Sequence, residues 1–262
     1  MSLSPFFAEA REFVADAPCN LRDLAAYLRA RASDAPRYLV GALLAVTVIG
    51  FALWAFVEIV EGFINEETLF RIDGFVKGTA ERIATPDVAR AMARVTNFAA
   101  PALVVVVTLA LAAYFAIRRV WDYLLMLALA LGLGEILLYA LKVAFDRARP
   151  TDGTAHDAYG ASFPSGHSFT ALVLYGLLAY FVWQLTDKRW ARVLAIAFAV
   201  ATTLAVGVSR LYLGVHWLTD VLGAYAAGVA WLVFSVALVR VLEARREHRG
   251  ASASARPRER EA

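Results

Sequence analysis

The chain has 262 residues, of which 60% are hydrophobic and 19% are charged, and its formal net charge is +3. The apolar residues are gathered in runs long enough to cross the roughly 30 Å hydrocarbon layer of a bilayer, which excludes an ordinary soluble domain. The single cysteine, Cys19, excludes a disulfide or a thiolate metal site within the chain, and nothing in the composition supports nucleic-acid binding.

Residues 1–37 precede the first apolar run. They mix charges with apolar positions such as Leu21, Leu24 and Leu28 at helical spacing, which predicts an amphipathic helical segment on the cytoplasmic membrane surface, with a turn near Pro18. Because a charged segment comes first and no small-residue cleavage pattern follows, the first apolar run is not typical of a cleaved signal peptide.

The apolar runs predict an all-α fold in which residues 38–241 form a bundle of six transmembrane helices. Residues 65–95, between the first two spans, are too polar to cross but carry apolar residues at helical spacing, so we expect one or two interfacial helices there, broken near Pro86. Residues 242–262 are predicted to form a disordered cytoplasmic tail. The six predicted spans are Tyr38–Val60, Phe98–Ile117, Tyr123–Phe145, Phe169–Leu185, Ala191–Val208 and Leu218–Val239.

The Lys and Arg residues near the span ends predict the orientation of the bundle. One side receives Arg29, Arg31, Arg37, Arg118, Arg119, Lys188, Arg189, Arg192, Arg240, Arg245, Arg246 and Arg249. We expect that side to be cytoplasmic, together with both termini, so that the polar segments described next face the exterior or the periplasm. Cations within residues 65–95 also fall on that outer face, but acidic residues of the same segment balance them. The Ala- and Arg-rich composition favours a bacterial inner membrane.

The first of three polar segments runs from Lys142 to Pro150. Lys142 and Arg149 are seven residues apart, or two helical turns, so a continuous helix would place both on one face with room for a phosphoryl group between them. Pro150 then ends the helix. The ordinary alternative is that Lys142 extends to the interface and that Arg147 and Arg149 are plain interface cations.

The second segment is Phe163–Ser168. Ser165 is placed to cap a helix that enters the fourth span, and Gly166 lets the backbone come close to a ligand. Free amides at such a helix end bind anions, and a protonated His167 beside the anion could donate to a leaving oxygen. A capped helix with an incidental histidine is the alternative.

The third segment, Ser209–Asp220, adds Arg210 and a second histidine at the mouth of the sixth span. Asp220 lies one helical turn after His216, so its carboxylate can fix the imidazole tautomer and leave the other nitrogen free to attack phosphorus. A minor surface pair of His216 and Asp220 is the alternative. Because the topology places all three segments on one face, we favour a single phosphate site over three independent coincidences.

Three other polar residues have weaker interpretations. Asp146 and Arg147 lie inside the first segment and are expected to form a local ion pair. Glu135 lies two helical turns before Lys142 on the same face, where it is either a carboxylate of the bundle interior or a partner for polar groups beneath the site.

The three segments together resemble the type 2 phosphatidic acid phosphatase superfamily of membrane lipid phosphatases. Its three-part signature is matched by Lys142 with Arg149-Pro150, by Pro164-Ser165-Gly166-His167, and by Ser209-Arg210 with His216 and Asp220. The motifs are specific because their spacing is defined over about 80 residues. The six-span layout extends the resemblance over 38–239, and residues 1–37 and 250–262 lie outside it.

The resemblance implies a two-step transfer through a phosphohistidine. His216 would be the nucleophile, Asp220 its orienting partner, and His167 the acid that protonates the leaving lipid oxygen and later assists water. Such a site is expected to need no metal or other cofactor, because its cations supply the charge stabilisation. The phosphate would be held by Lys142, Arg149, Arg210, the Ser165 hydroxyl and the amides around Gly166.

The leading hypothesis is therefore a phosphatase acting on a lipid phosphate or lipid pyrophosphate at the outer membrane face. The alternatives are a phosphotransferase that passes the same group to a lipid or sugar acceptor, and a non-catalytic protein that binds lipid headgroups. A soluble haloperoxidase of the wider superfamily is disfavoured by the six spans. Phosphatidic acid, phosphatidylglycerophosphate, undecaprenyl pyrophosphate and a lipid A phosphate are all candidate substrates, and the sequence leaves the oligomeric state open.

Overall fold

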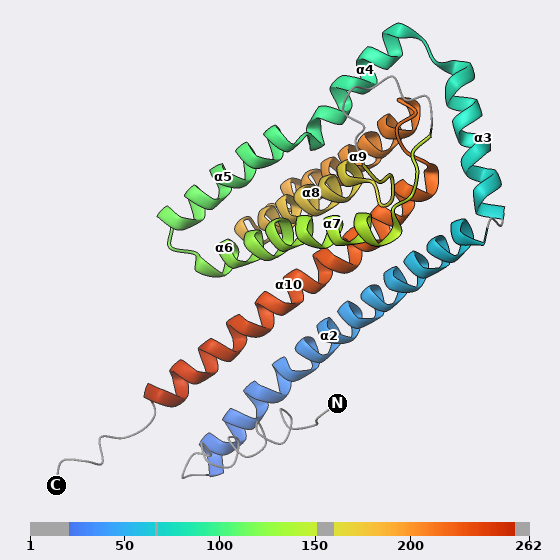
Figure 1. Ribbon diagram of the computed structural model, residues 1–262. Helices are drawn as coiled ribbons and strands as arrows, with labels where there is room; N and C mark the ends of the chain where they lie inside the picture. The colour runs from blue at the N-terminus through green and yellow to red at the C-terminus, as the bar shows by residue number, and fades with distance from the viewer. Residues whose placement is uncertain (1–20, 66–67, 151–159, 255–262) are drawn as a thin grey trace. The chain divides into compact units, whose positions relative to one another are not determined.

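The computed structural model describes residues 21–65, 68–150 and 160–254 (Figure 1). It divides into two compact units, Met1–Val46 and Thr47–Ala262, so the boundary falls within the first described helix. The predicted turn near Pro18 lies outside the described residues. The core, the site and every contact described below belong to the second unit.

All regular structure within the described ranges is helical, which confirms the predicted all-α class. The helices are α2 (Leu21–Ile64), α3 (Thr68–Ile83), α4 (Pro86–Thr96), α5 (Pro101–Ile117), α6 (Trp121–Leu127), α7 (Gly134–Phe145), α8 (Gly166–Leu185), α9 (Arg189–Tyr212) and α10 (Leu218–Ser254), with a 3-10 turn η1 (Asn97–Ala99) and a π-helical segment η2 (Ala128–Leu133).

Six stretches are long and apolar enough to cross a membrane, in agreement with the six predicted spans. They are Val40–Gly62, Pro86–Ile117, Trp121–Phe145, Gly166–Leu185, Arg189–Tyr212 and Leu218–Glu243. Helix α2 passes without a break through residue 37, and α10 stays helical through Ser254. Residues 255–262 lie outside the described part of the chain.

We predicted one or two interfacial helices in residues 65–95, and the structure has two, with the break at Ala84 and Thr85. The second of them, α4, falls within the apolar stretch Pro86–Ile117, so that stretch begins earlier than the predicted span at Phe98. The Thr85 hydroxyl accepts a hydrogen bond from Val88 N (3.4 Å), and Pro86 occupies the first helical position of α4. The Tyr212 hydroxyl, at the end of α9, accepts from Thr85 N (3.0 Å) and donates to Ile83 O (3.0 Å). This bond pair ties the α3–α4 corner to α9.

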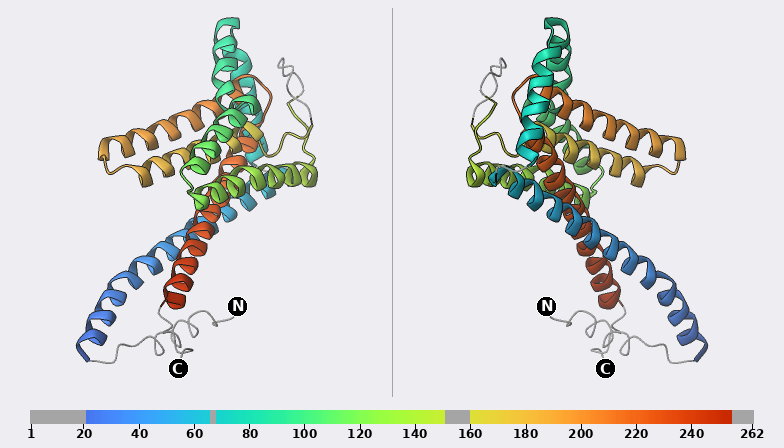
Figure 2. Two further views of the ribbon diagram at one scale, coloured as in Figure 1. Left: turned by 90° about the vertical axis from the view of Figure 1, so that its left-hand side faces the viewer. Right: turned by 90° about the vertical axis from the view of Figure 1, so that its right-hand side faces the viewer.

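The most enclosed helix is α8. In the apolar part of α8, 56% of the residues are buried, whereas the corresponding share is 33% or less in each of the other five spans. The reason is that α8 packs against both α9 and α10. Figure 2 shows α8 and α9 running side by side as an antiparallel pair. At one end of the core the Phe181 ring of α8 contacts the rings of Phe115 and Tyr123 (centroids 4.8 and 5.1 Å apart).

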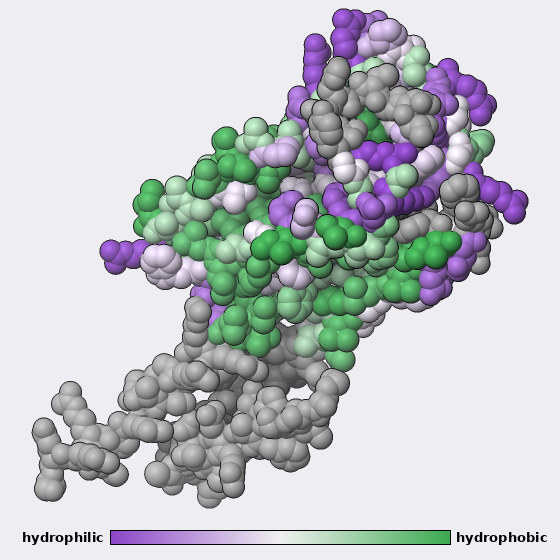
Figure 3. Space-filling view, viewed as in Figure 1, coloured by the Kyte–Doolittle hydropathy of each residue, from purple (hydrophilic) through white to green (hydrophobic). Residues whose placement is uncertain are grey.

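Much of the apolar surface faces outward. On α5, for example, Val106, Leu109 and Ile117 are 63%, 63% and 81% exposed. Hydrophobic side chains cover α5, α6 and α7 in Figure 3, whereas hydrophilic ones gather toward α3 and α4. A soluble protein does not leave so broad an apolar surface in water, and a bilayer covers it.

One aromatic side chain fixes the chain entering α8. Phe163 is fully buried and packs against the rings of Phe145 and Phe56 (centroids 5.1 and 5.5 Å apart). It also lies on α10 at Gly223, where a Cβ would come within 2.4 Å of Phe163 Cε2. Only glycine allows this approach. The start of α8 is therefore held against the end of α7 and the first turns of α10.

Candidate active site

The three polar segments converge. Arg149 Nη1 of the first segment donates to Val215 O of the third (2.9 Å), and the Phe145 ring of the first segment packs against the Phe163 ring of the second (centroids 5.1 Å apart). Between the second and third segments, Ser165 N donates to Asp220 O (3.1 Å). Residues far apart in the sequence are thus joined at one end of the bundle.

The first segment is not a continuous helix, the condition under which Lys142 and Arg149 would share one helical face. Helix α7 ends at Phe145, because Asp146 takes a left-handed backbone conformation (φ 35°), which Asp tolerates better than most residues. Lys142 and Arg149 are brought together by the following loop instead. Lys142 Nζ and Arg149 Nη2 both donate to Ala161 O, at 2.8 and 3.4 Å.

The second segment forms an open helix end. Ser165 is the N-cap residue of α8, as predicted, but its hydroxyl makes no capping bond and instead accepts from the Ser168 hydroxyl (3.0 Å). The first main-chain bond of α8 runs from Phe169 N to Ser165 O (3.0 Å). The amides of Gly166, His167 and Ser168 therefore have no acceptor within the helix and suit an anion.

Gly166 and His167 bring this helix end to the cations. A Cβ on Gly166 would lie 3.9 Å from Lys142 Cε, so the glycine backbone and the lysine stem are neighbours. The His167 side chain interacts electrostatically with Arg210, His216, Arg149 and Lys142. Both histidines thus belong to one group of charged side chains.

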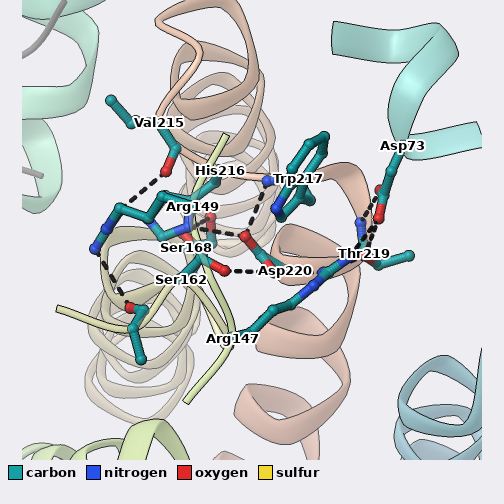
Figure 4. A network of polar contacts seen from close by, with 12 residues as sticks. Asp73, Arg147, Arg149, Ser162, Ser168, Val215, His216, Trp217, Thr219 and Asp220 are labelled. Atoms are coloured by element: carbon teal, nitrogen blue, oxygen red, sulfur yellow. Dashed lines mark hydrogen bonds and ion pairs between the residues drawn. The ribbon is translucent and has the colours of Figure 1, made fainter. Parts of the chain in front are cut away.

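The predicted contact between His216 and Asp220 is present in the third segment (Figure 4). Asp220 lies in the first turn of α10, and its Oδ2 is 3.2 Å from His216 Nδ1 and accepts from Trp217 N at 2.9 Å. The second bond is a capping interaction, since Trp217 directly precedes the helix. The carboxylate that caps α10 therefore also orients the imidazole, whose Nε2 faces Arg149 Nη1 at 3.3 Å.

Burial and charge set the protonation of this site. Burial lowers the pKa of His216 to about 4, an effect that the hydrogen bond and charge of Asp220 oppose and the charges of Arg149 and Arg210 reinforce. Burial also lowers the pKa of Arg149, with Asp220 again opposing, but a guanidinium remains charged at neutral pH. The site thus combines a neutral imidazole with fixed cations.

Arg210 is the most buried of these cations, with 4% of its surface exposed. Its Nη1 donates to the hydroxyl of Thr96 (3.1 Å), at the end of α4, and its carbonyl accepts from Val215 N (3.3 Å). The C-terminal end of α9 is thereby fixed against α4, and it carries a cation into the region of the two histidines.

Two residues of the site were missed. We expected Arg147 to pair with Asp146, but Asp146 is exposed, and Arg147 donates to Asp220 Oδ1 (2.7 Å) and Asp73 Oδ2 (2.8 Å). Asp73 was counted only as an outer-face charge, yet it is 1% exposed, while the apolar Phe75 is 68% exposed. The available signal was an acidic residue spaced between Leu69 and Val76, on the apolar side of the predicted helix.

Glu135 has a partner outside the cluster of cations and histidines. Its Oε1 accepts from the Thr170 hydroxyl of α8 at 2.6 Å. The contact joins α7 to α8, and Glu135 as a whole residue is exposed.

Comparison with known proteins agrees with this geometry. Residues 119–243, which include all three segments, match the PAP2 superfamily. Phosphatidylglycerophosphatase B from Bacillus subtilis (strain 168) is 34% identical over 182 residues, which are 68% of this chain and 88% of that protein. An undecaprenyl-diphosphatase from Sulfolobus acidocaldarius is 32% identical over 108 residues, 40% of this chain and 48% of the relative.

A solved structure has the same fold. The crystal structure of a transmembrane PAP2-type phosphatidylglycerolphosphate phosphatase from Bacillus subtilis superimposes with a TM-score of 0.63 at 29% identity, over 77% of this chain and 96% of the other. The three motifs, the helical bundle and these relatives agree, and the chain belongs to the PAP2 superfamily of membrane phosphatases.

Proposed function

We propose that this chain is a metal-independent phosphatase that removes phosphate from a lipid phosphate or lipid diphosphate through a phosphohistidine on His216. One observation carries the proposal: Asp220 holds His216 Nδ1 (3.2 Å) while Nε2 faces a phosphate-binding cation, Arg149 (3.3 Å). This arrangement is that of an oriented nucleophile beside an anion site. Because the chain is a membrane protein of a phosphatase superfamily, the anion is assigned to a lipid.

In the first step, the lone pair on His216 Nε2 forms a bond to phosphorus, and the bond from phosphorus to the lipid oxygen breaks. His167 gives its proton to that oxygen, so the lipid leaves as an alcohol, or as a monophosphate if the substrate is a diphosphate. Asp220 stabilises the positive charge that forms on the imidazole.

In the second step, water attacks the phosphohistidine. His167, now neutral, accepts a proton from the water, the bond between phosphorus and Nε2 breaks, and inorganic phosphate leaves. Both histidines return to their starting protonation states. The same group thus serves as acid and then as base, as microscopic reversibility requires.

Fixed cations would hold the phosphate oxygens through both steps. In the free protein Lys142 and Arg149 donate to the same carbonyl, Ala161 O, and Arg149 also reaches Nε2. Carbonyl and imidazole acceptors are weaker partners than a phosphate dianion, so an entering phosphate draws both side chains to itself and exposes the Nε2 lone pair. Arg210 and the open amides of α8 complete the set.

The proposed substrates present a phosphoryl group on an apolar anchor. The relatives are named for phosphatidylglycerophosphate and undecaprenyl diphosphate, and these two lipids lead the candidates for this chain. Phosphatidic acid and a lipid A phosphate share the same reacting group. An acceptor-dependent phosphotransferase uses the same first step, and phosphate release without an acceptor separates the two activities.

We assign the site to the non-cytoplasmic face of the inner membrane, with both termini in the cytoplasm. The support is the placement of basic residues at the span ends opposite the three segments. Arg118 and Arg119 follow α5, Lys188 directly precedes α9, and Arg189 and Arg192 lie at the start of α9. A headgroup at the outer leaflet then lies level with His216.

The experiment is phosphate release by detergent-purified protein, with EDTA present, from the four candidate lipids. The expected result is release from at least one lipid by the wild-type protein and none by the His216→Ala variant. Full activity of that variant would exclude the covalent route. Release that depends on an added alcohol or sugar would assign the transferase, and lipid binding without release would assign a headgroup-binding protein.

A further inference from the structure

Arg147 lies between two buried carboxylates (Figure 4). Its Nη1 donates to Asp220 Oδ1 (2.7 Å) and its Nη2 donates to Asp73 Oδ2 (2.8 Å). The side chains of Asp73, Arg147 and Asp220 are only 1%, 10% and 0% exposed. Arg147 is outside the defining positions of the motif, and Asp73 is outside the motif segments altogether.

Thr219 contacts both Arg147 and Asp73, and together with Asp220 these residues form one hydrogen-bonded network. Its hydroxyl accepts from Arg147 Nη1 (2.6 Å) and donates to Asp73 Oδ2 (2.6 Å), and its amide donates to Asp73 Oδ1 (2.9 Å). Since Thr219 lies in the first turn of α10, the Asp73 carboxylate sits at the positive end of that helix. Asp73 of α3 thus holds both Arg147 and the start of the helix that carries Asp220.

The balance of charge gives the network its function. A buried ion pair that loses one partner leaves an uncompensated charge, so Arg147 stabilises both carboxylates. If Arg147 faced Asp220 alone, its full charge would draw the carboxylate away from His216. Asp73 shares the guanidinium and so leaves Asp220 more of its negative charge for the imidazole.

We propose that Arg147 and Asp73 are positioning residues of the reaction, which fix the Asp220 carboxylate so that Oδ2 meets His216 and which couple helix α3 to the nucleophile. The proposal rests on the proposed function of the site. Neither residue is assigned a contact with the substrate, because both act through Asp220.

The charges around His216 give this role a specific signature. Within residues 21–65, 68–150 and 160–254, the other charged or titratable groups that face the imidazole are Asp220, Arg149, Arg210, His167 and, through His167, Lys142. None of them changes in the variants Arg147→Gln and Asp73→Asn. Loss of the Arg147 cation should raise the pKa of His216 by about one unit, whereas loss of the Asp73 anion should lower it. The double variant should lie between the two.

Kinetics provide the first test. Phosphate release at saturating lipid should fall about 10- to 100-fold in either variant, with KM changed less than kcat, since a misaligned nucleophile weakens the transition state rather than substrate binding. The double variant should be no worse than the poorer single variant, because the two residues act as a unit. Asp87→Asn is the matched control, as Asp87 pairs with Arg90 on the exposed surface of α4, and it should retain wild-type kcat.

Titration of the His216 imidazole by nitrogen-15 NMR provides the second test, with the resonance assigned by its loss in His216→Ala. Opposite pKa shifts in the two single variants support the proposal, and shifts of the same sign, or none in either, overturn it. If Arg147→Gln does not fold, Arg147→Lys serves: it keeps the cation but lacks the planar fork, so kcat should fall while the pKa stays near the wild-type value. Absence of phosphate release by the wild-type protein would count against the proposed function alone, because the titration needs no turnover.

Discussion

At the scale of single residues, Asp220 has partners on both of its carboxylate oxygens. One of its carboxylate oxygens meets His216 Nδ1 and Trp217 N, and the other accepts from Arg147. All three partners are donors, so both oxygens must be acceptors. An ionised aspartate satisfies this requirement and an asparagine does not, because its amide has a donor at one of the two positions.

Asp220→Asn should therefore lower kcat by up to about 10⁴-fold and leave a measurable rate, because the wrong tautomer of His216 is favoured while the nucleophile remains. The measurement is phosphate release at saturating lipid. Asp187→Asn, a fully exposed position between α8 and α9, is the control and should behave as wild type. A wild-type kcat in Asp220→Asn would remove Asp220 from the mechanism.

In a plot of kcat/KM against pH, the fall on the acidic side (the acid limb) should report the pKa of His216 in the free enzyme. Because burial lowers this pKa to about 4, the imidazole is neutral and nucleophilic above that pH and loses its lone pair to a proton below it. Activity should therefore fall on acidification near pH 4, well below the ordinary histidine pKa of about 6.5.

Because His216 must be neutral to attack and His167 must carry the proton that it donates, these opposite protonation demands predict a bell-shaped pH profile. In Asp220→Asn the acid limb should move further down, since the group that raises the His216 pKa is gone. An acid limb between pH 6 and 7 in the wild-type protein, or a rate that rises steadily from pH 4 to 9, would contradict the assignment.

At the scale of helices, the contact between Phe163 and Gly223 links the second motif to α10. A Cβ on Gly223 would lie 2.4 Å from Cε2 and 2.7 Å from Cζ of the Phe163 ring, so the ring must move. Phe163 is fully buried between other aromatic rings and has little room to do so.

Gly223→Ala should destabilise the protein by about 1–3 kcal/mol through overpacking and should lower phosphate release, because the displaced ring shifts the start of α8. Thermal unfolding in detergent and the phosphatase assay measure the two effects. Gly50→Ala in α2 is the matched control: no atom lies within 4 Å of a Cβ there, and alanine favours a helix over glycine. Equal unfolding temperatures for the two variants would refute the steric argument.

The helices of the structure also show which features the spacing of apolar residues could predict and which it could not. Spacing predicted helical structure in residues 65–95, as one or two helices, and Pro86 predicted a break; the structure has two helices that meet just before Pro86. Spacing failed for Lys142 and Arg149, because Asp146 ends α7 in a left-handed conformation that no apolar period encodes. It also failed for Asp73, since the face of α3 that packs against the protein includes this carboxylate, while Phe75 is exposed.

At the scale of the whole molecule, the distribution of charge argues for one orientation in the membrane. Two exposed aspartates at opposite ends of the spans are suitable positions for a test of this orientation. Asp87 lies at the start of α4 with its side chain 85% exposed, and Asp187 lies between α8 and α9 with its side chain 106% exposed. The chain has a single native cysteine, Cys19, so Cys19→Ser gives a background without thiols.

In that background, Asp87→Cys should react with a membrane-impermeant maleimide in cells whose outer membrane has been opened, and Asp187→Cys should react only after lysis. Denatured samples of both variants establish that each thiol can be labelled. The reverse pattern would place the three segments in the cytoplasm.

By itself, the sequence determined the helical class, the six spans and the residue types of the site, because hydropathy, helical spacing and motif spacing are properties of short stretches of chain. Only the tertiary structure decided which polar groups meet. Arg147 bonds to Asp73 across 74 positions and Asp73 to Thr219 across 146. Such partners depend on how helices pack and on where each helix ends, and a buried charge is stabilised by whichever opposite charge the packing brings to it.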